Sequence, residues 1–373
     1  LERLAKFTSR VIPTMVICYF LLTLGVLLQN LSAIPTAFSS IFIGAFSGSS
    51  VAGGFIGTHL VARLCLEYKN AVIVLADIKP THDWNVDGNW IPEFNDNGNT
   101  LTYVVGDLRD DAVAKELFCQ RFDETWHLAC DHGGIGYLKS REYECGLDIS
   151  INANVLKYHI ESGSGTFFFA SSACVYNEDL QQDTSNTVYL KESDVYPANP
   201  DSVYGWVKLL TEQMIIAAQK ERGLDARIAR IHGCYGTHGA FDNIKEKAPN
   251  ALMRKASSSK TTLDVWGGLD TVRSFMYVSD CVEAFMRLMR SDYDKPINIG
   301  SDMTVTIGEV ANIANEIAHS TGNLLPINVV SGERGVACRS CDCTLMEEVL
   351  DFKPSIHVRD GLAKVYNWQK LMF

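Results

Sequence analysis

Two groups of polar residues near the middle of the chain have the types and spacing needed to move protons and a hydride on a sugar. Tyr204 and Lys208 are four residues apart in YGWVK, so on a helix they share one face. A neighbouring ammonium lowers the pKa of a tyrosine, which then removes a proton from a hydroxyl group. About thirty residues earlier, an apolar run ends in SSAC, which contains Ser172 and Cys174. A YxxxK pair alone is weak evidence for a catalytic tyrosine. When a strand that ends in paired serines precedes the pair, the evidence becomes strong.

The composition is that of a folded, acidic globular protein. Hydrophobic residues make up 47% and charged residues 21% of the 373 residues. The net charge of -11 argues against nucleic acid as the main partner. The eleven cysteines are scattered, which is typical of reduced thiols. Cys338, Cys341 and Cys343 form CxxCxC without a second ligand pair, so we expect no metal site.

The N-terminal part of the chain predicts a membrane helix. Residues 11–62 contain no Asp, Glu, Lys or Arg, and residues 11–28 form an almost unbroken apolar run. This length is close to what a bilayer requires, and basic residues precede the run. We therefore expect a transmembrane helix at about 11–32, within an N-terminal segment 1–37. The alternative is a buried helix packed on the following domain.

From residue 38 onward, short apolar runs alternate with helical stretches. This pattern predicts a Rossmann-like, doubly wound parallel sheet covered by helices on both faces. The predicted NAD-binding domain spans 38–236, and 237–373 form mainly a smaller C-terminal substrate lobe, with 274–292 returning to the first domain. The predicted strands are 41–43, 71–76, 102–105, 125–129, 166–170 and 226–231, and the first helix is 55–66.

Glycines and acidic residues at the predicted strand ends indicate a dinucleotide site. GGFIG provides Gly54 and Gly57, but the first glycine of the motif is replaced by Val51, or else Gly44 takes its place before an insertion. Asp77, twenty residues past Gly57, favours NAD over NADP. A degenerate domain that binds its cofactor poorly is the alternative. The expected cofactor contacts are Gly54, Phe55, Ile56, Gly57, Asp77, Asp107, Leu108, Tyr204 and Lys208.

From about residue 55 to its C-terminus, the chain resembles the extended short-chain dehydrogenase/reductases, and among them the GDP-mannose 3,5-epimerase family. The segments that carry the resemblance are GGFIG, DLRD, DHGGIGYLKS, FFFASSACVY, LKESDVYPANPDSVYGWVK, KEKAPNAL, VRSFMYVSDCVEA and PINIGSD. GGFIG, YGWVK and PINIGSD are common among nucleotide-sugar enzymes. The combination of SSAC with DHGGIG and EKAP is far more specific to the GDP-mannose 3,5-epimerase family.

The resemblance implies an NAD-dependent isomerase of a GDP-mannose-like nucleotide sugar. The sugar would be oxidised at C4 with Tyr204 as the base and Ser172 bound to the C4 oxygen. Cys174 and Lys247 would then exchange protons at C3 and C5, before C4 is reduced again. The remaining substrate contacts that the resemblance implies are Gly133 beside the sugar, and Arg273 and Arg339 near the nucleotide diphosphate.

The chain also departs from that family at expected ligand contacts. The glycine-rich loop is altered, and Gly233 and Thr237 replace the usual asparagine and proline. Together with the predicted membrane helix, these changes leave two alternatives open. One is a catalytically reduced or inactive accessory subunit of a membrane complex, such as a mitochondrial respiratory complex. The other is a Golgi type II nucleotide-sugar epimerase or decarboxylase. We expect a membrane-associated protein of the mitochondrial inner membrane or the Golgi, bound to complex subunits or forming a homodimer.

Overall fold

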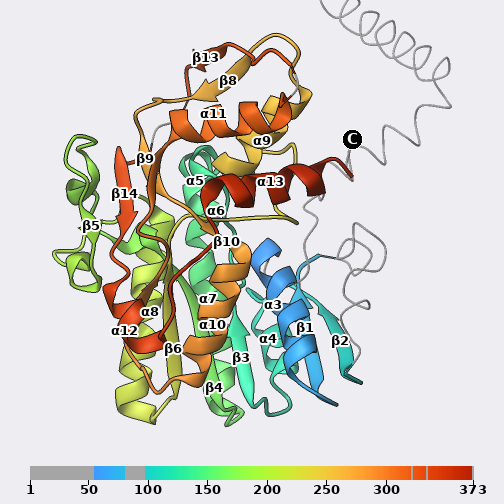
Figure 1. Cartoon of the computed structure of the whole chain (residues 1–373). Coiled ribbons are helices and arrows are strands. Elements are labelled where there is room, and N and C mark those ends of the chain that lie inside the picture. The colour runs from blue at the N-terminus through green and yellow to red at the C-terminus, as the bar shows by residue number, and fades with distance from the viewer. Residues whose placement is uncertain (1–53, 80–96, 321, 333–334, 372–373) are drawn as a thin grey trace, which may run out of the picture. The chain divides into compact units, whose positions relative to one another are not determined.

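The computed structural model defines the C-terminal six-sevenths of the chain, with short gaps. The predicted membrane helix at 11–32, the predicted strand at 41–43 and Val51 lie outside the described residues, so they stay predictions. No helix within the described part is both long and apolar enough to cross a membrane. The structure describes residues 54–79, 97–320, 322–332 and 335–371 (Figure 1).

A parallel sheet forms the centre of the fold, which confirms the predicted α/β Rossmann-like class. Four strands lie in the order β11-β6-β4-β3, and β1 and β2 form a separate parallel pair. Every strand predicted within the described residues is present, with ends that differ by at most a few residues. The strands are β1 (Val72–Asp77), β2 (Thr100–Val105), β3 (Glu124–His127), β4 (Thr166–Ser172), β6 (Ala226–Ile231) and β11 (Pro296–Ile299).

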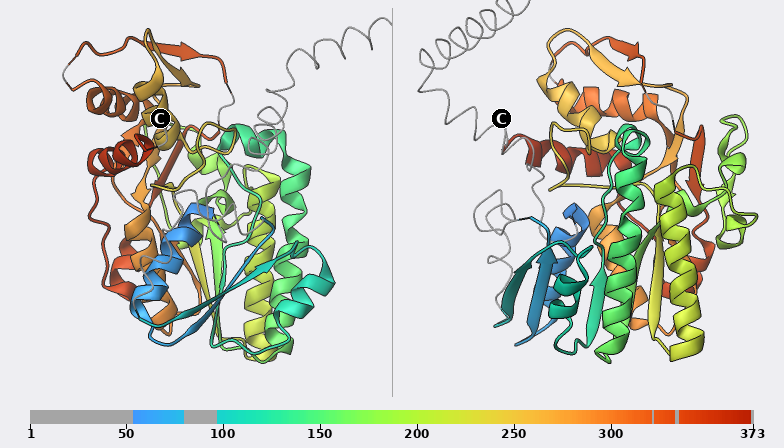
Figure 2. Two further views of the ribbon diagram at one scale, coloured as in Figure 1. Left: turned by 90° about the vertical axis from the view of Figure 1, so that its right-hand side faces the viewer. Right: turned by 180° about the vertical axis from the view of Figure 1, so that it is seen from behind.

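Helices cover both faces of this sheet, as Figure 2 shows. The consecutive residues Phe167, Phe168 and Phe169 of β4 are all fully buried, although neighbouring side chains of a strand point to opposite faces. Phe168 packs in the cluster that includes α3 (Gly54–Glu67) and α10 (Val278–Arg290). The other two pack in the cluster that includes α4 (Asp111–Leu117), α7 (Asp148–Glu161) and α8 (Val203–Arg222).

The remaining elements come mainly from the C-terminal half, and several of them lie beyond one end of the sheet (Figure 1). The helices are α5 (Ile135–Ser140), α6 (Glu142–Gly146), α9 (Ala248–Ser258), α11 (Ile307–Ala318), α12 (Thr344–Leu350) and α13 (Val358–Gln369), with 3-10 turns η3 (Ala173–Val175), η4 (Glu178–Gln181) and η5 (Glu192–Val195). The strands are β5 (Tyr189–Leu190), β7 (Cys234–Tyr235), β8 (Leu263–Trp266), β9 (Val272–Ser274), β10 (Met276–Tyr277), β12 (Thr304–Thr306), β13 (Ile327–Val330) and β14 (Cys338–Cys341).

A buried ion pair fixes α8 against the sheet. Arg230 on β6 binds Glu212 on α8 at 2.7 Å, and the two side chains are 4% and 0% exposed. Ser171, near the end of β4, also donates a hydrogen bond to Glu212. Removing one member of such a pair leaves an uncompensated charge in the interior. The position of α8, which carries Tyr204 and Lys208, is therefore set by charge as well as by packing.

Candidate active site

The first turn of α8 lies directly against the turn η3, which follows β4. A Cβ atom added at Gly205 would lie 2.2 Å from the backbone oxygen of Cys174, so a glycine is required there. Ser202 caps this end of α8, because its Oγ accepts a hydrogen bond from the Gly205 N–H at 3.3 Å. Tyr204 and Cys174 are thereby held in the same packed cluster.

Lys208 and Tyr204 share one face of α8, as their spacing predicts. Lys208 is 1% exposed, and its Nζ donates a hydrogen bond to the backbone oxygen of Ala170 at 2.8 Å. The same ammonium lies 5.6 Å from the centre of the Tyr204 ring. The lowered pKa of Tyr204 that the sequence predicts is wrong. Burial raises the pKa of Tyr204 well above its ordinary value, and a hydrogen bond with Ser172 only partly opposes this.

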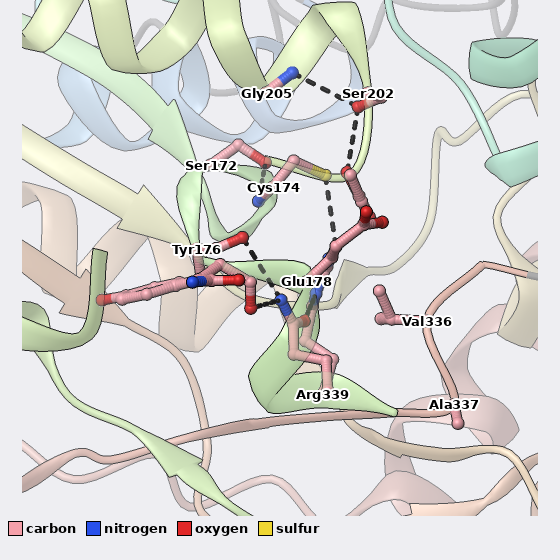
Figure 3. A network of polar contacts seen from close by, with 12 residues as sticks. Ser172, Cys174, Tyr176, Glu178, Ser202, Gly205, Val336, Ala337 and Arg339 are labelled. Carbon is pink, nitrogen blue, oxygen red and sulfur yellow. Dashed lines mark hydrogen bonds and ion pairs between the residues drawn. The ribbon is translucent and has the colours of Figure 1, made fainter. Parts of the chain in front are cut away.

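Ser172 and Cys174 meet a basic residue from the other half of the chain (Figure 3). Ser172 Oγ accepts a hydrogen bond from the Cys174 N–H at 3.1 Å, which fixes the start of η3. The Cys174 Sγ accepts one from Arg339 Nη1 at 3.2 Å. Arg339 and Arg273 lie opposite each other on β14 and β9. Arg273 instead donates to the backbone oxygens of Val272 on β9 and of Val336 and Ala337, which precede β14.

Lys247 reaches the site from the start of α9. Its Nζ donates a hydrogen bond to the Gly133 oxygen at 2.9 Å. The residue as a whole is partly exposed, but its ammonium is enclosed, and this burial lowers the pKa of Lys247. The charge of Cys174 opposes that shift, so the two groups lie within electrostatic reach of each other. Gly133, Cys174 and Lys247 are thus brought together from three separate segments.

A cavity of about 360 Å³ opens at the carboxyl ends of β1, β2 and β3, and Lys247 lines it whereas Gly133 and Cys174 do not. Gly54, with a φ of 73°, starts α3 at one wall of the cavity. Asp107 lines it too, and the pKa of that carboxyl is lowered by its hydrogen bond with Arg109. Ile56 and Gly57 lie within α3 and are not part of the lining. The predicted site residues that line the cavity are Gly54, Phe55, Asp77, Asp107, Leu108 and Lys247.

Comparison with known proteins decides the family. The model of the NAD dependent epimerase/dehydratase family matches residues 51–300. The chain belongs to this family. A second model, of the sodium:alanine symporter family, matches only residues 1–65, most of which lie outside the described part.

The chain is also similar to curated members of the epimerase/dehydratase family. It is 37% identical over 323 residues to GDP-mannose 3,5-epimerase 1 of Oryza sativa subsp. indica, with 86% of this chain and 80% of the relative covered. It is 29% identical over 312 residues to UDP-glucuronic acid decarboxylase 6 of Arabidopsis thaliana, covering 83% and 84%. The resemblance inferred from the sequence motifs is confirmed.

Solved structures of the epimerase type share the fold. The UDP-glucuronic acid 4-epimerase of Bacillus cereus, in complex with UDP-glucuronic acid and NAD, has a TM-score of 0.71 at 21% identity, with 86% of this chain and 98% of that chain covered. The UDP-glucose 4-epimerase of Thermotoga maritima with UDP-glucose has a TM-score of 0.70 at 20% identity, covering 86% and 97%.

Two polar groups of this epimerase-family site are missing from the sequence-based prediction. Asp148, at the start of α7, is 2% exposed, lines the cavity and accepts a hydrogen bond from the Asp131 N–H at 2.7 Å. Burial raises the pKa of Asp148 to about 7. Lys245 pairs with Asp131 at 2.6 Å. KEKAP contains Lys245 and could have indicated it, whereas no motif marks Asp148.

Gly205→Ala tests the contact between α8 and η3. The new methyl group would overlap the Cys174 backbone oxygen, so we expect a loss of about 1–3 kcal/mol in the free energy of unfolding. Urea unfolding followed by circular dichroism measures it. Gly136→Ala is the control, because its methyl group would meet only a Trp266 ring atom at 3.7 Å, an ordinary contact. Equal midpoints for wild type and Gly205→Ala would contradict the close approach.

Proposed function

We propose that the chain is an NAD-dependent nucleotide-sugar epimerase that exchanges protons at C3 and C5 of GDP-mannose or a close relative. The observation that supports the proposal is the packing of Tyr204 against Cys174, together with the hydrogen bonds of Ser172 with Cys174 and of Lys247 with Gly133. The 37% identity to the rice GDP-mannose 3,5-epimerase supports the choice of substrate.

The first step takes place at C4 of the sugar. Tyr204 accepts the proton of the C4 hydroxyl group while Ser172 donates a hydrogen bond to the same oxygen. The buried Lys208 ammonium, anchored by Ala170, stabilises the phenolate form of Tyr204 that accepts this proton. Burial disfavours the negatively charged phenolate of Tyr204. The phenolate therefore requires a fixed cation nearby, which is the Lys208 ammonium.

The second step uses the acidity that a C4 ketone gives to the hydrogens at C3 and C5. A base removes such a proton from one face of the ring, and an acid returns one to the other face. The enclosed ammonium of Lys247 gives up a proton more readily than an exposed lysine, because burial lowers its pKa. Lys247 therefore suits the role of acid, and the Cys174 thiolate suits that of base.

The residues around the cavity fit a dinucleotide. Its volume of about 360 Å³ falls in the range of ligand pockets, and it extends from Gly54 at the start of α3 to Asp77 and Asp107 at strand ends. The N-terminus of α3 would face the pyrophosphate, and Asp77 would bind the ribose hydroxyl groups. When bound at this site, NAD⁺ would supply the hydride acceptor for oxidation at C4, and its reduced form would supply the hydride for the final reduction.

The cofactor assignment predicts that NAD(H), and not NADP(H), is released when the purified protein is denatured. The Asp77 carboxylate repels a 2′-phosphate, so Asp77→Ser should reduce the preference for NAD(H). An enzymatic cycling assay of the released nucleotide measures both. Recovery of NADP(H) alone would exclude the specificity, and recovery of neither would favour a degenerate scaffold.

The acid–base assignment predicts deuterium at C3 or C5 when the NAD⁺-loaded protein is incubated with GDP-mannose in D₂O. Cys174→Ser should slow this exchange by about 100-fold, because it removes a proton-transfer group, and should change GDP-mannose affinity little. Nuclear magnetic resonance of the recovered sugar measures the exchange. Cys119→Ser, at an exposed thiol, is the matched control. Wild-type protein that shows no exchange would refute the proposal for this substrate.

The apolar N-terminal run supports a separate proposal, that residues 11–32 anchor the chain in a membrane. The full chain should then stay in the membrane pellet after alkaline carbonate extraction. A variant that lacks residues 1–37 should be released by the same treatment. Release of the full chain would show that this segment is no anchor.

A further inference from the structure

Each of the three guanidinium nitrogens of Arg339 has a partner within the protein, and one of these partners is the candidate catalytic thiol. Nη1 donates to Cys174 Sγ at 3.2 Å, Nη2 binds Asp201 Oδ2 at 2.7 Å, and Nε donates to Gln181 Oε1 at 2.6 Å. Every nitrogen of the guanidinium therefore has a partner, and the three partners come from separate places in the chain. Arg339 is held in a single orientation, with one N–H directed at sulfur.

The groups that hold Arg339 are themselves fixed. Asp201 has 6% of its side chain exposed, and it also accepts a hydrogen bond from Ser202, the N-cap of α8. Gln181 is 1% exposed and donates to backbone oxygens through its amide nitrogen. Arg339 thus links β14 to the cap of α8 and to η4. Moving it would require breaking contacts that are almost entirely screened from water.

We propose that Arg339 is a positioning residue for Cys174, which holds the sulfur in one orientation and carries the positive charge that balances its thiolate. A charge-assisted hydrogen bond of this kind is stronger than a neutral one and fixes the position of the sulfur. The thiolate takes the proton from the sugar carbon and becomes a neutral thiol, while the electron pair stays in the enolate. This last part rests on the proposed function, whereas the pairing of the two residues does not.

Other charges near the sulfur do not take this role. Tyr204, Lys247 and Arg273 each lie within electrostatic reach of Cys174, but the structure records no hydrogen bond from them to Sγ among the described residues. Arg273 is the closest match to Arg339, because the two arginines face each other on paired strands. Within the described part of the chain, its guanidinium donates hydrogen bonds to backbone oxygens.

The alternative role for Arg339 is a direct contact with the nucleotide diphosphate, as the family resemblance implies. The two roles differ in what a substitution changes. A partner of the thiolate alters the reactivity of Cys174 even when no nucleotide is present. A phosphate ligand alters the affinity for GDP, which has the diphosphate and lacks the sugar.

The test measures the rate at which iodoacetamide alkylates Cys174 in the folded, nucleotide-free protein at one neutral pH. Mass spectrometry of the peptide that contains Cys174 follows the reaction, and the exposed Cys119 serves as the internal standard. Arg339→Gln should slow alkylation by about tenfold or more, the effect of losing a hydrogen bond to a charged group. Arg339→Lys should recover part of the rate, and Arg273→Gln should change it by no more than about twofold, because it removes a nearby charge without removing a hydrogen bond.

The result that would overturn the proposal is an unchanged alkylation rate in Arg339→Gln together with weaker binding of GDP by calorimetry. Asp201→Asn, which removes the charge that anchors Arg339, provides a second test if Arg339→Gln does not fold, and it should slow alkylation by a smaller factor. An unchanged rate in Asp201→Asn would then count against the proposal. If alkylation is slowed in Arg339→Gln but the wild-type protein shows no deuterium exchange, the proposed epimerase activity is refuted. The pairing of Arg339 with Cys174 is then still supported.

Discussion

The close approach of α8 to the turn after β4 is the constraint on which the candidate site depends. Because Gly205 has no side chain, the helix backbone lies against the Cys174 carbonyl group. This single contact brings Tyr204 beside the thiol and lets Lys208 reach the end of β4. The buried Glu212–Arg230 pair fixes the same helix two turns further on. A shift of α8 would therefore displace the phenol and the ammonium together.

Burial has a second consequence at this site, because it favours the uncharged form of each group. It raises the pKa of Tyr204, lowers that of Lys247 and raises that of Asp148 to about 7. An enclosed site of low polarity strengthens every interaction between charges that develop during a reaction. Burial acts to lower the pKa of Arg339 as well, but the charges of Cys174 and Asp201 outweigh burial and raise this pKa. A permanent positive charge thus remains beside the sulfur while its neighbours favour neutrality.

The sequence allowed much of the fold to be predicted, and less of the site. Apolar runs located the strands well, since β1 spans Val72–Asp77 where 71–76 was expected. The helical spacing of Tyr204 and Lys208 was also sufficient to place them on one face. The sign of the Tyr204 pKa shift was wrong, because desolvation depends on packing that an i, i+4 rule does not include. The contact between Arg339 and Cys174 joins residues 165 positions apart and depends on where β14 pairs.

The departures from the family pattern are integrated into the packing of this chain. Gly233, where the resemblance implies an asparagine, has a φ of 41°, and a Cβ atom there would lie 2.0 Å from the Ser274 oxygen. A side chain at this position would separate the end of β6 from the loop between β9 and β10, where the Gly233 oxygen accepts a hydrogen bond from the Met276 N–H at 3.3 Å. Gly233 thus has no side chain to contact a ligand, and its lack of a side chain allows a close backbone contact instead. Such an exchange is expected of a domain whose sequence still specifies its fold, and it argues against simple decay of the site.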